Sequence, residues 1–250
     1  MLLGAFILCV EFAKKLQKAA SPAPVFDINW RMGSVAEVFL IFVSFQAVAV
    51  FFKNPFVGSA HHEGVEAVWA MVEYLFLLVL VWFILRFILK KDLAHAGWRL
   101  EEMKADAQVA FRGILFIGVL TVLTNFLYWT ELLTPSSKII RHIKISDLFS
   151  QGIFSLIQMG LVLLVSPACE ETFYRGFVYP VLRNSLPRGI SIFLLSLFFS
   201  AVHFQWSYFV LLFLMSWAVT AAYDKTQRLF APLAIHGFYN LLVLLGFFSY

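Results

Sequence analysis

Charged residues are scarce in this chain: they make up 14% of its 250 residues, whereas hydrophobic residues make up 61%. A soluble globular domain carries about 25% charged residues. The apolar residues also fall in blocks long enough to cross the roughly 30 Å hydrocarbon layer of a bilayer. The composition therefore excludes an ordinary soluble domain and indicates a polytopic membrane protein.

Cysteine is nearly absent as well, since Cys9 and Cys169 are the only two in the chain. Two cysteines are too few for a disulfide framework or a thiolate metal site. The net charge is only +4, and no basic run is interleaved with aromatic residues as in a nucleic-acid-binding module. We therefore expect no nucleic-acid partner.

The apolar blocks are continuous runs without the alternation of a membrane barrel, so they predict helices rather than strands. We expect an all-α bundle of seven or eight transmembrane helices in one membrane domain, residues 1–250. The blocks are Leu2–Phe12, Val35–Phe52, Val68–Leu89, Val109–Trp129, Ile153–Val181, Ile190–Phe204, Tyr208–Tyr223 and Phe230–Phe248. The first block is short and is expected either to span the membrane or to lie at its interface. Segment 92–108 is rich in charges and predicts a solvated helix between two spans.

Three charges interrupt one of these blocks: Glu170, Glu171 and Arg175. An ionised group at the bilayer centre costs about 2.5–3.5 kcal/mol on insertion scales, so such groups usually mark a functional site. Glu171 and Arg175 are four residues apart, share a helix face and are predicted to pair. Glu170 points about 100° away. In an apolar cavity its carboxylate is our candidate general base.

Two later blocks contribute His203, His236 and Asn240. At about 1.5 Å per residue, Glu170, His203 and Asn240 fall at a similar depth, with His236 one turn from Asn240. This alignment requires one helix from Ile153 through the motif to Arg183, kinked at Pro167. Glu170 and His203 could then deprotonate a water, while His236 and Asn240 donate hydrogen bonds to an oxyanion.

At these residues the chain resembles the CAAX protease and bacteriocin-processing family of glutamic intramembrane proteases, which includes the type II CAAX prenyl endopeptidases. The family pattern EExxxR, FxxxH, HxxxN stands here as Glu170-Glu171-xxx-Arg175, Phe199-xxx-His203 and His236-xxx-Asn240, within residues 153–245. The resemblance implies four catalytic residues and three supporting ones: Glu170, His203, His236 and Asn240, and Glu171, Arg175 and Phe199. It implies no cofactor and no metal.

The resemblance also implies a substrate and a location. The substrate would be a membrane-anchored or prenylated protein or peptide, cut near its lipidated or anchored terminus. The protein itself would be embedded in the lipid bilayer as an integral multi-pass protein, in the plasma membrane of a prokaryote.

Other functions fit the same residues. Glu170, His203 and His236 offer the three ligands of a catalytic zinc site, although no HExxH pair is present and Arg175 would lie near the cation. The polar cluster could also serve packing alone, in a non-catalytic membrane scaffold or bacteriocin-immunity factor. A transporter is weaker, because the sequence contains no inverted repeat.

Overall fold

The computed structural model describes residues 26, 28, 30–53, 62–130, 153–203 and 208–247. Within these ranges the chain forms helices and no strand, so the all-α prediction is confirmed. The chain divides into two compact units. The first consists of Met1–Trp98 with Ala168–Leu195, and the second of Arg99–Pro167 with Ser196–Tyr250.

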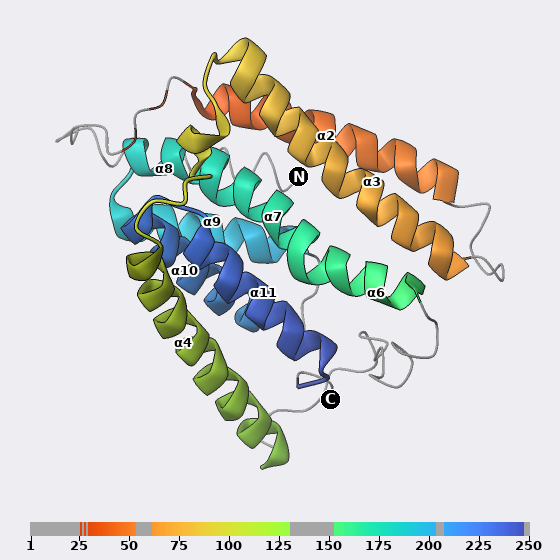
Figure 1. Ribbon diagram of the computed structural model, residues 1–250, viewed down its shortest axis with the longest axis vertical. Coiled ribbons are helices and arrows are strands. Elements are labelled where there is room, and N and C mark those ends of the chain that lie inside the picture. Colours follow the sequence, from red (N-terminus) through yellow and green to blue (C-terminus); the bar gives the residue numbers. More distant parts are fainter. Residues whose placement is uncertain are drawn as a thin grey trace. The chain divides into compact units, whose positions relative to one another are not determined.

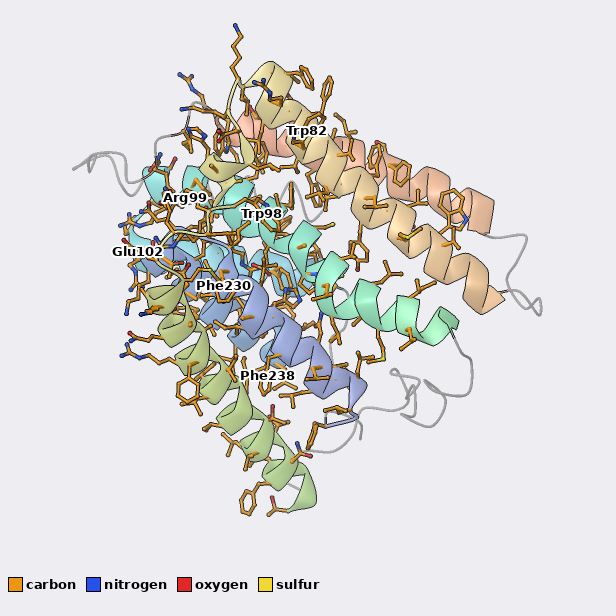
Figure 2. All side chains as sticks on the ribbon, in the orientation of Figure 1. Trp82, Trp98, Arg99, Glu102, Phe230 and Phe238 are labelled. Carbon is orange, nitrogen blue, oxygen red and sulfur yellow. The ribbon has the colours of Figure 1, made fainter. Side chains whose placement is uncertain are left out.

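In the first unit, helices α2 (Met32–Lys53) and α3 (His62–Phe83) pack side by side (Figure 1). The rings of Phe45 and Phe76 stack with their centroids 4.0 Å apart. Helix α3 continues into the π-helical segment η2 (Ile84–Ile88). Exposed apolar side chains recur every three or four residues along α3, which places them on one face: Val68, Val72, Leu75, Val79 and Trp82, the last labelled in Figure 2.

The helix that carries the Glu-Glu-Arg motif runs without interruption from Ile153 to Ser185, as predicted. Its parts are α6 (Ile153–Gly160), η4 (Leu161–Val165), α7 (Ser166–Glu171), η5 (Thr172–Val178) and α8 (Tyr179–Ser185). Segments η4 and η5 are π-helical. One widened turn therefore precedes Pro167, and another follows the two glutamates. The helix ends at Leu186, whose backbone is extended, because a residue directly before a proline disfavours the helical conformation.

In the second unit, helices α4 (Met103–Trp129), α10 (Phe209–Thr226) and α11 (Phe230–Leu244) pack against one another. Gly113 allows the close approach of α4 to α11, since a Cβ there would collide with the side chain of Ile235. Helix α9 (Arg188–Val202) belongs to the first unit up to Leu195 and to the second from Ser196.

Two helices in the described part are long and apolar enough to cross a bilayer, over Met71–Ile88 and Met103–Leu127. Shorter apolar helices cover Met32–Phe45, Arg188–Val202 and Phe230–Leu244. The number of seven or eight spans therefore stays a prediction. The block Leu2–Phe12 lies outside the described residues.

The prediction of one solvated helix over residues 92–108 is wrong. The segment contains a short 3-10 turn, η3 (Leu93–Ala96), and α4 begins only at Met103. Left-handed backbone at Gly97 (φ 97°) and Glu102 (φ 54°) interrupts the helix, and glycine is the residue that adopts this conformation without strain. The segment is also not fully solvated, because Asp106 has no exposed surface.

Asp106 binds Arg228, which lies between α10 and α11 in the same unit. Both Arg228 Nε and Nη2 donate to the Asp106 carboxylate, at 2.8–3.1 Å. Arg228 Nη2 also donates to Glu102 at 3.2 Å, but the side chain of Glu102 is 70% exposed. The bonds to Asp106 raise the pKa of Arg228, so the guanidinium stays charged. This bidentate pair joins the start of α11 to α4.

We predict that Asp106→Ala lowers the free energy of unfolding by about 3 kcal/mol, because it leaves the Arg228 charge without its buried partner. Glu102→Ala removes an exposed partner of the same arginine and should cost less than about 1 kcal/mol. Thermal or denaturant unfolding of the purified protein in detergent measures both. Equal effects of the two substitutions would contradict the assignment of Asp106 as the anchor.

Candidate active site

The first unit holds the predicted ion pair of the motif. Arg175 Nη1 donates to Glu171 Oε1 at 2.9 Å, and neither side chain has exposed surface, so the predicted pairing is confirmed. Removing one member of such a pair would leave an uncompensated buried charge. Glu170 is only partly buried. The two adjacent carboxylates therefore differ in environment: Glu171 is fully buried and Glu170 is partly buried.

Aromatic side chains surround this pair. Phe173, Tyr174 and Phe177 are all buried, and the Arg175 guanidinium lies 5.9 Å from the centre of the Tyr174 ring. Trp30 stacks on Phe177 at 5.5 Å, and its Nε1 donates to the carbonyl oxygen of Phe177 at 2.9 Å. This contact anchors the end of η5 to the segment before α2.

The second unit holds the two histidines. His203 follows the last residue of α9, and its Nδ1 lies 2.6 Å from the carbonyl oxygen of Phe199. A carbonyl only accepts, so Nδ1 carries the proton in this bond. In the neutral ring, Nε2 then carries the lone pair that can accept a proton from water.

Phe199 links the two histidines. Its ring lies 4.5 Å from that of His203 and 6.0 Å, edge to face, from that of His236 on α11. Phe199 has no exposed surface and His236 is 3% exposed. The expected packing of Phe199 beside His203 is therefore present, and the contact with His236 adds the second imidazole to the same cluster.

Asn240 of α11 satisfies a carbonyl that the motif helix leaves unused. Its Nδ2 donates to the carbonyl oxygen of Val162 in η4 at 2.9 Å. Within the helix, the Ser166 N–H bonds to Leu161 instead, and Pro167 has no N–H to offer Val162. An amide has two N–H donors, so this bond holds the Asn240 side chain and occupies one of them.

Gly237 permits this approach of the two helices. A Cβ at Gly237 would lie 3.1 Å from the carbonyl oxygen of Leu163, which is tighter than most real contacts. The smallest residue therefore stands beside η4, one turn before the position from which Asn240 reaches Val162. The packing sets which α11 side chains meet the motif helix.

The units divide the predicted site. Glu170, Glu171 and Arg175 belong to the first unit, while Phe199, His203, His236 and Asn240 belong to the second. Within the second unit, the FxxxH and HxxxN motifs meet at Phe199. The common depth of Glu170 with His203 and Asn240 stays a prediction.

Metal ligation was the chemical rival. Within either unit by itself, the described residues include no group of three His, Cys, Asp or Glu side chains placed to hold a metal ion.

Sequence reasoning missed the groups that hold these motifs. Trp98 Nε1 donates to Thr172 Oγ1 at 2.9 Å, and the Val162 carbonyl receives Asn240. Thr172 directly follows the two glutamates and is a polar residue in an apolar run, which was the one available signal. Trp98, 74 residues away along the chain, gave none.

These features define a class of protein: all-helical, with titratable side chains set among apolar helices. Within that class, residues 152–242 match the family model described as type II CAAX prenyl endopeptidase, Rce1-like. The chain is therefore similar to these endopeptidases over the segment that carries all three motifs, and the predicted resemblance is confirmed. No curated protein and no solved structure matches the chain.

Because Asn240 supplies the donor that Pro167 lacks, a second substitution at Pro167 should compensate for the loss of Asn240. Asn240→Leu should lower the free energy of unfolding by about 1 kcal/mol, because the Val162 carbonyl loses its donor. Adding Pro167→Ala supplies a backbone N–H at the position that the helix lacked, and should recover part of this loss. Unfolding of the single and double variants in detergent measures the coupling.

Asn125 provides the matched control for this cycle. Its Nδ2 donates to the carbonyl oxygen of Phe247, a contact that does not involve Pro167. The effects of Asn125→Leu and Pro167→Ala should therefore add. Additivity in the Asn240 cycle as well would contradict the proposed competition for the Val162 carbonyl.

Proposed function

We propose that this chain is an intramembrane endopeptidase of the glutamic type. It hydrolyses a peptide bond near the lipidated or membrane-anchored terminus of a protein, using a water molecule activated by Glu170 and His203. The observation that carries the proposal is the match to type II CAAX prenyl endopeptidases over residues 152–242, because this segment contains every residue of the predicted site. A prenylated protein is accordingly the proposed substrate class.

The chemistry proposed for Glu170 is general-base catalysis. Its carboxylate takes a proton from water while the oxygen attacks the carbonyl carbon, and the C=O π electrons move to the oxygen. The proton then passes to the departing amide nitrogen as the C–N bond breaks. The products are a new carboxyl terminus and a free amine, with no covalent enzyme intermediate.

His203 supports this step through its tautomer. Because Nδ1–H is donated to the Phe199 carbonyl, Nε2 is the atom that accepts a hydrogen bond from the water. The imidazole is also held against the Phe199 ring. Its role is to orient the water for Glu170.

His236 and the second N–H of Asn240 are the proposed oxyanion donors. His236 is almost completely buried, and donors are worth more in a site without water than in solution. The bond from Asn240 to Val162 fixes the amide plane in advance, so little reorganisation accompanies charge development.

The central test is Glu170→Gln, assayed with a farnesylated, internally quenched peptide that ends in a CAAX sequence. We expect kcat to fall by about 10²- to 10⁴-fold, because the amide cannot accept the proton. Mass spectrometry of the peptide products locates the cleaved bond. Glu73→Gln, which alters a partly buried carboxylate on α3, should retain native activity.

Full activity of Glu170→Gln would refute the glutamic mechanism. Comparison of protein termini in cells carrying the native protein or Glu170→Gln then identifies the cellular substrate. A terminus found only with the native protein is expected; its absence, together with no peptide cleavage by the native protein, would favour the scaffold function.

Chelation separates the proposed mechanism from zinc hydrolysis. We expect cleavage of the same peptide to survive prolonged treatment of the purified protein with a strong chelator, since water is activated by side chains alone. Loss of cleavage that is restored by added zinc would replace the glutamic mechanism with metal-assisted hydrolysis.

A further inference from the structure

A relay of two hydrogen bonds lies directly on the Glu-Glu-Arg motif in the first unit. Trp98 Nε1 is 2.9 Å from Thr172 Oγ1, and Thr172 Oγ1 is 2.6 Å from the carbonyl oxygen of Ala168. The indole is only a donor and the carbonyl is only an acceptor. The direction is therefore fixed: Trp98 donates to the Thr172 hydroxyl, which donates to Ala168.

The two helix residues of this relay, Ala168 and Thr172, flank the glutamates in the sequence. Ala168 precedes Glu170 by two residues, and Thr172 directly follows Glu171. Thr172 is also the first residue of η5, where the helix widens to the π form. The Thr172 hydroxyl thus connects the turn that carries both carboxylates to Trp98, at the point where the helix changes from the α to the π form.

The turn that presents Trp98 is itself fitted to the motif helix. Ala96 has no exposed surface and abuts Gly176, where a Cβ would lie 2.5 Å from the Ala96 carbonyl oxygen. Gly176 is four residues after Thr172, so both contacts fall on one side of the helix. Only glycine at position 176 allows the turn to sit this close.

Local interactions fix the shape of this turn. The Asp92 side chain accepts from the His95 backbone N–H at 3.3 Å and contacts His95 Nδ1 at 2.7 Å. Hydrogen bonding to His95 lowers the pKa of Asp92, so the cap is ionised at neutral pH. Gly97, with φ 97°, then turns the chain so that Trp98 reaches Thr172 (Trp98 is labelled in Figure 2).

We propose that Trp98 is a positioning residue for hydrolysis, which acts through Thr172 to set the orientation of Glu170 and Glu171. The inference rests on the proposed function. Trp98 touches no reacting atom in this scheme; it holds the helical turn from which the base projects. Its loss should therefore lower kcat, which depends on base geometry, and leave KM unchanged.

The test compares Trp98→Phe with native protein on the farnesylated quenched peptide. Phenylalanine keeps an aromatic ring and removes the N–H, so kcat per mole of folded, monodisperse protein should fall about fivefold, as expected for one neutral hydrogen bond. Thr172→Val should lower kcat at least as much, and Thr172→Ser, which keeps the hydroxyl, should restore it to within about twofold.

Non-additivity tests whether the two residues act as one unit. The double variant Trp98→Phe/Thr172→Val should have the kcat of Thr172→Val alone, because the Trp98 N–H has no acceptor once the Thr172 hydroxyl is removed. Gly176→Ala provides a second perturbation, since it displaces the turn without removing a hydrogen-bonding group. It should lower kcat in the same direction.

Trp82→Phe is the matched control, since Trp82 lies on the exposed face of α3 in the same unit. Its kcat and KM should stay native. Native kcat in Trp98→Phe and Thr172→Val would overturn the inference, as would reduced melting temperature with unchanged kcat, which signifies a purely structural role. Glu170→Gln distinguishes the failures: if it is inactive while Trp98→Phe is native, only the positioning role fails; if it is fully active, the proposed function fails.

Discussion

Backbone carbonyls that the helical ladder leaves unused must find donors inside the protein, because an apolar helix bundle offers no water to replace them. One carbonyl of the motif helix shows this constraint directly. Asn240 serves the Val162 carbonyl, which Pro167 deprives of an N–H. The His203 and Thr172 side chains also bond to backbone carbonyls, those of Phe199 and Ala168, each four residues earlier in the chain. Asn240 and His203 are therefore oriented by bonds to the backbone.

The two buried charge pairs show how differently the same chemistry can be used. Asp106 binds Arg228 with two guanidinium nitrogens, and joins an interhelical segment to α4. Glu171 binds Arg175 through one nitrogen on its own helix, four residues away. The first pair connects separate elements of the second unit and stabilises their packing. The second pair lies within one helix, directly beside Glu170 in the sequence, and does not cross to another helix.

Local spacing predicted the parts of the site that depend on one helix. Four-residue separation was enough to predict the contact of Glu171 with Arg175, and the family pattern was enough for that of Phe199 with His203. The run through Pro167 was predicted from the need to align polar residues. The prediction for segment 92–108 failed because it rested on charge content, which indicated a solvated helix. Left-handed backbone at Gly97 and Glu102 interrupts that helix. Contacts such as Trp98 to Thr172 join distant segments, and no periodicity encodes them.

Glu170 and Glu171 are adjacent in the sequence but lie in different environments. Glu171 is fully buried, and its carboxylate binds Arg175. Its neighbour Glu170 retains partial exposure. Both glutamates lie at the end of α7, and the turn that follows them, in η5, is widened to the π form. The bonds from Trp98 and Trp30 lie at the two ends of that turn, at Thr172 and Phe177. They connect the widened segment to other elements of the first unit, in addition to its own backbone hydrogen bonds.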